Sequence, residues 1–332
     1  MTTVLASLNA GLRRCLEQSE QVYLLGEDLL DPYGGAFKVT QGLSSDYPQR
    51  VITTPVSEAA IVGVGVGMAM RGFLPVVEIM FGDFLTLAAD QILNHAAKFN
   101  WISGGEVEVP IVIRTPMGGR RGYGPTHSQT LEKHFLGIPG LRTLAVNTLA
   151  KPGEVLEIAV LDDSAPVLLI ENKVLYAQQV FDAANESEYD LMAWEGKYPL
   201  HRLTISGAPS PTLTLLAYGH MAELVRSAML DLAYEHEIFT ELIVTTQLSP
   251  FALEPLLEHT QATGRLLVAE EGTQTLGYGA EVIARLASAS KNPFQCRRVA
   301  ARDMPVPAAG TLEAQMLPQV EDVIAAAREM VK

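Results

Sequence analysis

The sequence is poor in cysteine and in basic residues, and each shortage excludes a class of protein. Its two cysteines, Cys15 and Cys296, lie far apart and outside any CxxC or Cys/His spacing, so we expect neither a disulfide framework nor a zinc site. The 24 Lys and Arg residues stand against 38 Asp and Glu, which gives a formal net charge of -14. Binding to nucleic acid or to an anionic membrane needs a basic face, so we expect neither partner.

Long apolar runs are also missing. The longest apolar-rich segment, 59–70, falls short of the ~20 residues that a transmembrane helix needs. Near the N-terminus, Arg13, Arg14 and Glu17 interrupt the apolar residues and no small-residue cleavage site follows, so we expect a helix rather than a signal peptide. These absences indicate a cytoplasmic protein that binds small molecules or other proteins.

What the chain does contain is a regular alternation of short apolar runs and helical patterns, which is typical of parallel sheets covered by helices. With 332 residues and 48% hydrophobic residues it can form two cores. We therefore predict an α/β protein with two doubly wound domains, 1–182 and 212–332, joined by a linker at 183–211 where polar residues and prolines gather. The expected strands are 22–25, 51–53, 76–80, 110–114, 144–146, 167–171, 212–218, 240–244, 265–269 and 297–300. The expected helices are 3–18, 58–71, 84–100, 152–161, 221–234, 251–259, 279–289 and 320–331.

A cluster of three glycines, Gly63, Gly65 and Gly67, does not fit a dinucleotide-binding turn. The third glycine comes one residue too early, and the cluster lies inside a helical pattern rather than between a strand and a helix. With neighbouring alanines it forms a small-residue helix face. We interpret this face as a site of close packing against another helix.

Glu58 opens the same helix, directly after a predicted strand. A carboxylate there either complements the helix dipole or faces the ligand crevice of an open α/β sheet. Three further segments also lie at carboxyl ends of predicted strands. They are Gly26-Glu27-Asp28, Met80-Phe81-Gly82-Asp83-Phe84 and Pro125-Thr126-His127-Ser128-Gln129.

In their order, spacing and residue types these segments resemble those of the beta subunits of pyruvate, branched-chain 2-oxo acid and acetoin dehydrogenases. The resemblance runs from 22 to about 176 and returns at 277–281, 303–307 and 312–313. It implies a transketolase-like pyrimidine-binding domain followed by a transketolase C-terminal-like domain, and thiamine diphosphate as the cofactor. The expected reaction is oxidative decarboxylation of a 2-oxo acid with transfer of the acyl group to lipoamide.

The resemblance also implies how the cofactor's aminopyrimidine ring is held. Glu58 would hydrogen-bond a ring nitrogen and share a proton with it, which prepares the thiazolium carbon for deprotonation. Met80 would line the cleft, and Phe84 would lie beneath the ring as a platform, where stacking contributes about 0.5–1.5 kcal/mol beyond area burial. The alternative for Phe84 is an ordinary core residue.

Two more residues match catalytic positions of the family. Glu27 would pass protons between the cofactors of paired active sites, or would simply be a polar residue that ends a strand. His127, in a glycine-rich loop, would donate a proton during acyl transfer or bind the substrate carboxylate, and its near-neutral pKa suits either task. A structural loop histidine is the alternative. Arg120 and Arg121 would contact a carboxylate or a partner, or be solvated.

By the same family pattern the backbone carbonyls of Ile111, Ala159 and Asp162 would hold a structural potassium ion. The alternative is an ordinary helix end before the strand at 167–171. Backbone ligands leave little side-chain signature. The potassium site is therefore an expectation from resemblance alone.

One part of a complete cofactor site is missing. The magnesium ion that binds the diphosphate needs Asp and Asn ligands in a Gly-Asp-Gly context, and this segment does not occur in the chain. By resemblance a separate alpha subunit supplies magnesium and diphosphate ligands in an α2β2 tetramer, with a lipoyl acyltransferase as a further partner. The segment 240–250 departs from the family, which makes that docking less secure. Two alternatives stay open, an acyloin-forming or transketolase-like carboligase subunit and a non-catalytic pairing subunit.

Overall fold

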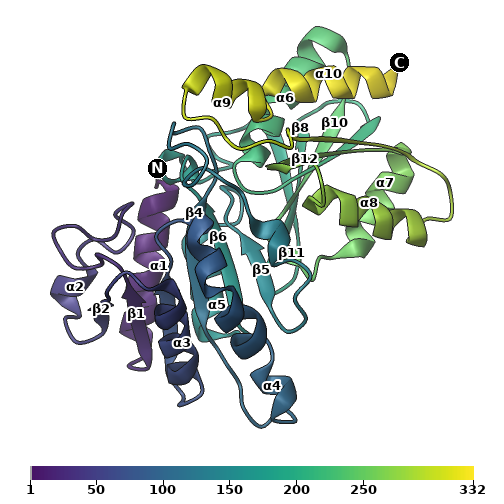
Figure 1. The fold of residues 1–332 in the computed structure, drawn as a ribbon. Helices are drawn as coiled ribbons and strands as arrows, with labels where there is room; N and C mark the ends of the chain where they lie inside the picture. The colour runs from purple at the N-terminus through teal and green to yellow at the C-terminus, as the bar shows by residue number, and fades with distance from the viewer. Residues whose placement is uncertain (1) are drawn as a thin grey trace.

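A computed structural model describes residues 2–332 of the chain, which fold around two sheets (Figure 1). The first sheet has seven strands in the order β11-β5-β6-β4-β3-β1-β2. Six of them are mutually parallel, as expected of a doubly wound sheet. They are β1 (Val22–Gly26), β2 (Val51–Thr53), β3 (Leu74–Glu78), β4 (Val112–Met117), β5 (Arg142–Ala145) and β6 (Val167–Asn172). The seventh, β11 (Gln247–Ser249), comes from the second half of the chain and runs antiparallel to β5.

Helices cover both faces of this sheet, because successive strand residues point to opposite sides. Val76 of β3 packs with α1 (Val4–Gln18) and α5 (Pro152–Leu161), whereas its neighbour Val77 packs with α3 (Glu58–Ala69). α1 and α5 approach closely at a pair of glycines. A Cβ on Gly11 would lie 2.5 Å from the carbonyl oxygen of Gly153, so a larger residue there would separate the two helices.

The predicted helix at 84–100 is not a single α-helix. Its range holds a 3₁₀ segment, η1 (Gly82–Ala88), a π-helical segment, η2 (Gln91–Ala96), and a short α-helix, α4 (Phe99–Ile102). Such departures from α geometry often occur where a functional side chain must be aimed. The short elements α2 (Leu43–Asp46), η3 (Glu132–His134) and η4 (Leu175–Ala177) escaped prediction because they span only three or four residues.

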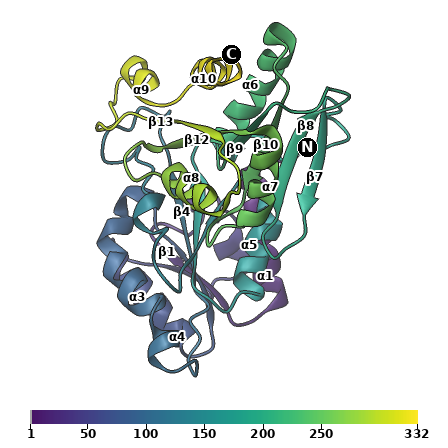
Figure 2. The same cartoon turned by 90° about the vertical axis from the view of Figure 1, so that its right-hand side faces the viewer.

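The second sheet has six strands in the order β13-β12-β9-β10-β8-β7 (Figure 2). The first four of this order are parallel: β13 (Gln295–Ala301), β12 (Arg265–Thr273), β9 (Leu213–Ala217) and β10 (Thr240–Thr245). The range 183–211, predicted as a linker, contains the other two, β7 (Tyr189–Trp194) and β8 (Leu200–Ile205). They form a hairpin that pairs antiparallel with β10. Half of the β7 side chains are exposed, which weakened the apolar signal in this range.

Helices also cover both faces of the second sheet. α6 (Met221–His236) and α10 (Val320–Val331) pack on one face, and α7 (Leu253–Thr263) and α8 (Tyr278–Ala289) pack on the other. α9 (Gly310–Met316) lies just before α10. The core under α7 and α8 is continuous with the core of the first sheet, since Leu216 and Val268 share one cluster with Ile113. None of the helices in the described residues is long and apolar enough to cross a membrane.

Candidate functional site

The residues expected to bind the cofactor lie together at the carboxyl ends of β1 to β4. Glu27 directly follows β1, and Glu58 opens α3 five residues after β2. Met80 and Phe84 follow β3, and the loop that carries His127 follows β4. Because carboxyl ends of parallel strands share one edge of a sheet, the fold gathers these segments at one edge of the first sheet.

Two buried carboxylates lie at this edge of the sheet. Glu27 and Glu58 are only 6% and 5% exposed. Burial raises the pKa of Glu27, and the negative charges of Glu58, Asp28 and Glu78 raise it further. Glu58 is therefore close enough to Glu27 to influence its protonation.

An aromatic group surrounds His127. Its imidazole meets the ring of Phe81 at 4.9 Å between centroids and that of Phe84 at 5.2 Å, both edge to face. Phe84 is only partly buried, and so is Met80. The structure thus brings the predicted platform residue and the predicted catalytic histidine into direct contact.

Two polar contacts anchor the segment that holds His127. Buried Asp83 accepts hydrogen bonds from the backbone N and the side-chain Nε2 of Gln129, at 3.2 and 2.8 Å. Lys173, which follows β6, donates from Nζ to the carbonyl oxygen of His127 at 2.6 Å. Burial lowers the pKa of the Lys173 ammonium to about 8, although nearby carboxylates partly oppose this. Sequence reasoning missed Lys173, despite its place directly after a buried parallel strand.

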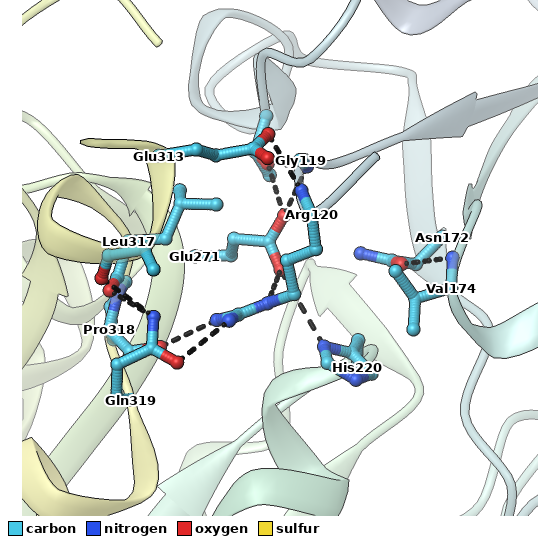
Figure 3. A network of polar contacts seen from close by, with 12 residues as sticks. Gly119, Arg120, Asn172, Val174, His220, Glu271, Glu313, Leu317, Pro318 and Gln319 are labelled. Atoms are coloured by element: carbon cyan, nitrogen blue, oxygen red, sulfur yellow. Dashed lines mark hydrogen bonds and ion pairs between the residues drawn. The ribbon is translucent and has the colours of Figure 1, made fainter. Parts of the chain in front are cut away.

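The glycine-rich part of the same loop is held by carboxylates of the second domain (Figure 3). The Gly119 amide donates to Glu271 Oε1 at 2.8 Å, and the amides of Arg120 and Gly122 donate to the two oxygens of Glu313 at 2.8 and 3.2 Å. Gly118 turns the chain with φ 92°, and a Cβ there would lie 2.4 Å from Asn172 Nδ2. Only glycine fits at that point.

Arg120 has a structural contact that the sequence did not indicate. Its guanidinium donates to the Pro318 carbonyl at 2.5 Å and to Gln319 Oε1 at 3.3 Å, and lies 3.7 Å from Glu271. Burial would raise the pKa of Glu271, but His220, Arg120 and the amide donor outweigh it and lower that pKa to about 2. Arg120 therefore joins the two domains, whereas Arg121 is exposed.

A buried ion network lies between the central strands. The Arg114 guanidinium donates two hydrogen bonds to Glu171, at 2.8 and 2.7 Å, and a third to Glu78. The hydroxyl of Tyr176 also donates to Glu171, at 2.6 Å. Burial raises the pKa of Glu78, and Arg114 opposes this. Glu78 ends β3 and contributes to the raised pKa of Glu27, so the network lies close to Glu27.

The carbonyls expected to bind potassium lie at two elements of the first domain. Ala159 is buried in α5, and Asp162 is its C-cap residue. The carbonyl oxygen of Asp162 accepts a hydrogen bond from Lys197 Nζ at 2.7 Å, and that of Ile111 accepts one from the Val167 amide at 2.8 Å. No group of three or more His, Cys, Asp and Glu side chains placed to hold a metal ion occurs within residues 2–332.

Comparison with known protein families matches both halves of the chain. Residues 1–179 match the pyrimidine binding domain of transketolase, and residues 206–323 match the transketolase C-terminal domain. The chain is 34% identical to pyruvate dehydrogenase E1 component subunit beta-1, mitochondrial, of Arabidopsis thaliana, over 98% of this chain and 88% of that protein. The chain belongs to the transketolase-like family of pyruvate dehydrogenase beta subunits.

Other members of the family match at similar levels. The pyruvate dehydrogenase beta subunit of Leifsonia xyli subsp. xyli is 35% identical over 96% of this chain and 91% of its own length. That of Rhizobium meliloti is 33% identical over 98% of this chain and 69% of its own length. Among solved structures, a protein described as a split gene transketolase, inactive beta4 tetramer, has a TM-score of 0.75 at 17% identity, covering 100% of this chain and 99% of that one. This last likeness shows the fold alone. The predictions of family and fold class are confirmed.

Proposed function

We propose that the chain is the beta subunit of a heteromeric thiamine-diphosphate-dependent 2-oxo acid dehydrogenase, and that it holds the aminopyrimidine half of the cofactor. The single observation that carries this proposal is Glu58, a 5% exposed carboxylate at a helix start, at the same edge of the first sheet as Glu27, Phe84 and His127. The full-length similarity to proteins named pyruvate dehydrogenase beta subunits supports it.

These residues fit the aminopyrimidine of thiamine diphosphate. A flat heteroaromatic ring needs an apolar surface, which partly buried Met80 and Phe84 offer, and an acid that shares a proton with a ring nitrogen, which Glu58 offers. When bound, the cofactor supplies the electron sink that decarboxylation of a 2-oxo acid requires. The protein supplies position, proton transfer and exclusion of water.

Glu58 and Glu27 have different roles in proton transfer. Glu58, at the start of α3 and beside Glu27, would hold the proton that is shared with the ring nitrogen. Glu27, whose pKa is raised by burial and by the charge of Glu58, keeps a proton more readily than an exposed glutamate. It therefore serves as the proton reservoir next to Glu58, in line with a relay between paired sites.

His127 acts later in the reaction, during transfer of the acyl group. Phe81 and Phe84 fix the plane of its imidazole, and the Thr126 hydroxyl lies 3.0 Å from Nδ1. Nε2 is then the atom that exchanges a proton with the acceptor. Lys173 holds the backbone of His127, so it positions the histidine without reacting itself.

We further propose that an alpha subunit completes the site in an α2β2 tetramer and supplies the ligands of magnesium and of the diphosphate. The chain has no Gly-Asp-Gly segment for that purpose. A groove of about 340 Å³ beside α3, lined by Ala59, Gly63 and Gly67, offers a surface for a closely packed helix. No atom lies within 4 Å of a Cβ built on Gly67, so the surface is open there. Gly65 does not share this surface, because a Cβ on it would lie 2.8 Å from side-chain atoms of Val77 and Ile111.

Lipoamide as acceptor and a lipoyl acyltransferase as partner belong to the same proposal, as do the domain bounds 1–182 and 212–332 and a cytoplasmic location. Some of the relatives are named as mitochondrial. A carboligase subunit would use the same cofactor but would produce an acyloin and ignore lipoamide. Comparing acyloin formation with lipoamide reduction by the assembled enzyme therefore separates these two functions.

The test combines cofactor binding with exchange at the cofactor's reactive carbon. We expect Glu58→Gln, in the complex with an alpha subunit, to bind thiamine diphosphate and magnesium but to slow hydrogen–deuterium exchange at the thiazolium carbon by about 10²–10⁴-fold. Calorimetric titration and exchange before any 2-oxo acid is added measure the two quantities. Glu154→Gln is the matched control, because it makes the same change in the first turn of α5. Wild-type exchange in the fully loaded Glu58→Gln variant would contradict the proposal.

A further inference from the structure

The turn of the β7–β8 hairpin, which belongs to the second sheet, contacts the end of helix α5, which covers the first sheet. Lys197 lies in that turn, between β7 and β8. Its Nζ donates to the carbonyl oxygen of Asp162, the C-cap residue of α5, at 2.7 Å and lies 3.8 Å from Asp163 Oδ1. The last carbonyls of a helix carry partial negative charge, so a cation is stabilising there.

A second cation and a phenol complete the surroundings of Asp163. Its carboxylate is 5% exposed. Oδ2 lies 2.7 Å from Arg142 Nε and accepts a hydrogen bond from the Tyr198 hydroxyl, also at 2.7 Å. One buried carboxylate thus faces two cationic side chains, and all of its charge is compensated by the chain itself.

We propose that the ammonium of Lys197 takes the place of the potassium ion that the family pattern puts at the end of α5, so that this protein does not need a monovalent cation for stability. An ammonium carries the same single charge as potassium and has three donors for carbonyl and carboxylate oxygens. It is tethered to the chain, so no ion is lost on dilution or in low salt.

Potassium itself does not fit the observed arrangement. Of the three expected carbonyls, that of Asp162 already accepts a hydrogen bond from the Lys197 ammonium, so a cation already lies against this oxygen. A potassium ion at Asp162 would also share the Asp163 carboxylate with Lys197 and Arg142, and like charges at such distances repel strongly. The two side-chain cations leave no negative charge to attract a third.

The side chain of Lys197 is 42% exposed, so ions from solution can reach the site once the lysine is replaced. This makes the proposal testable by the effect of salt on stability. Thermal unfolding of the full chain is measured in potassium chloride and in tetramethylammonium chloride at equal ionic strength. The wild-type midpoint should be the same in both salts.

Lys197→Met should lower the midpoint in tetramethylammonium chloride by about 1–3 °C, because a charged hydrogen bond at the helix end is lost. Potassium chloride should restore it. Lys197→Arg keeps the charge and should stay indifferent to the choice of salt. Lys291→Met is the control for loss of an exposed lysine and should behave as the wild type.

Each outcome bears on the proposal, and none depends on catalysis or on the identity of the 2-oxo acid. A wild-type midpoint raised by potassium alone overturns it, because the site would then take an ion beside the lysine. A Lys197→Met midpoint equal to that of Lys291→Met overturns it too. If the Lys197→Met midpoint is lowered and potassium chloride does not raise it, the end of α5 is not a cation site, and the proposal is wrong.

Discussion

Glu132 allows a quantitative test of how the two domains meet. Its side chain is fully buried in η3, and the hydroxyl of Tyr218, from the second domain, donates to Oε1 at 2.5 Å. Among the described residues no group hydrogen-bonds Oε2. Burial raises the pKa of Glu132 from 4.5 to about 7, with Tyr218 opposing the shift and the charges of Glu270 and Glu271 adding to it.

The sign of the effect on stability follows from the two protonation states. Between pH 4.5 and about 7 folded Glu132 keeps a proton that the unfolded chain has released, so stability falls as the pH rises through this window. This loss of stability is complete once the pH exceeds the pKa of Glu132 in the folded protein. A change in pKa from 4.5 to about 7 corresponds to about 3 kcal/mol at 1.36 kcal/mol per pH unit.

We therefore expect the difference in unfolding free energy between Glu132→Gln and wild type to shift by about 3 kcal/mol in favour of the variant as the pH rises from 4.5 to 8. The amide keeps an acceptor for Tyr218 but cannot ionise, and its unpaired donor costs about 1–3 kcal/mol at every pH. Urea unfolding of both full chains across this range measures the difference, with Glu321→Gln as a control on the exposed start of α10. A difference that does not change with pH would refute the reasoning.

Two further predictions concern the loop after β4. His127→Ala in the assembled enzyme should reduce lipoamide-dependent turnover by about 10²–10⁴-fold and affect carbon dioxide release to an artificial electron acceptor less; equal losses would assign His127 to substrate binding. Glu313→Gln removes the negative charge and replaces one of the two oxygens that accept loop amides with an NH2 donor, so trypsin should cut after Arg120 or Arg121 at least about tenfold faster, whereas Glu321→Gln should not change the rate. Unchanged cleavage in Glu313→Gln would show that the carboxylate does not hold the loop.

Periodicity predicted the elements that are long, regular and buried. α5 and α10 begin and end where their apolar spacing does, and β6 is buried at all six positions. It failed where burial is one-sided or the helix is irregular. The local pattern predicts a linker where β7 and β8 lie, and one α-helix over 84–100 where three different helical segments lie. That range begins beside Asp83, in a 3₁₀ helix rather than an α-helix. The hydrogen bond between Asp83 and Gln129 joins residues far apart in the sequence, so a local pattern cannot predict it.

The candidate site was predictable to the extent that it depends on strand ends. Glu27, Glu58 and the segment ending at Phe84 each follow a parallel strand, so a correct strand assignment suffices to bring them together. Lys173 obeys the same rule after β6 and could have been found by it. Lys197 could not, because its partner Asp162 lies on a helix of the other domain and neither residue belongs to a motif.

The contacts that no local pattern reveals have a common origin in the second domain. Glu271 and Glu313 bind amides of the loop that carries His127, Lys197 binds the end of α5, and β11 extends the first sheet. In each case a charge or a strand from the second domain meets unpaired backbone groups of the first. The second domain therefore fixes the position of the loop after β4, although this loop and His127 are part of the first domain. For that reason, substitutions at Glu271 or Glu313 should alter acyl transfer through His127 without touching the cofactor.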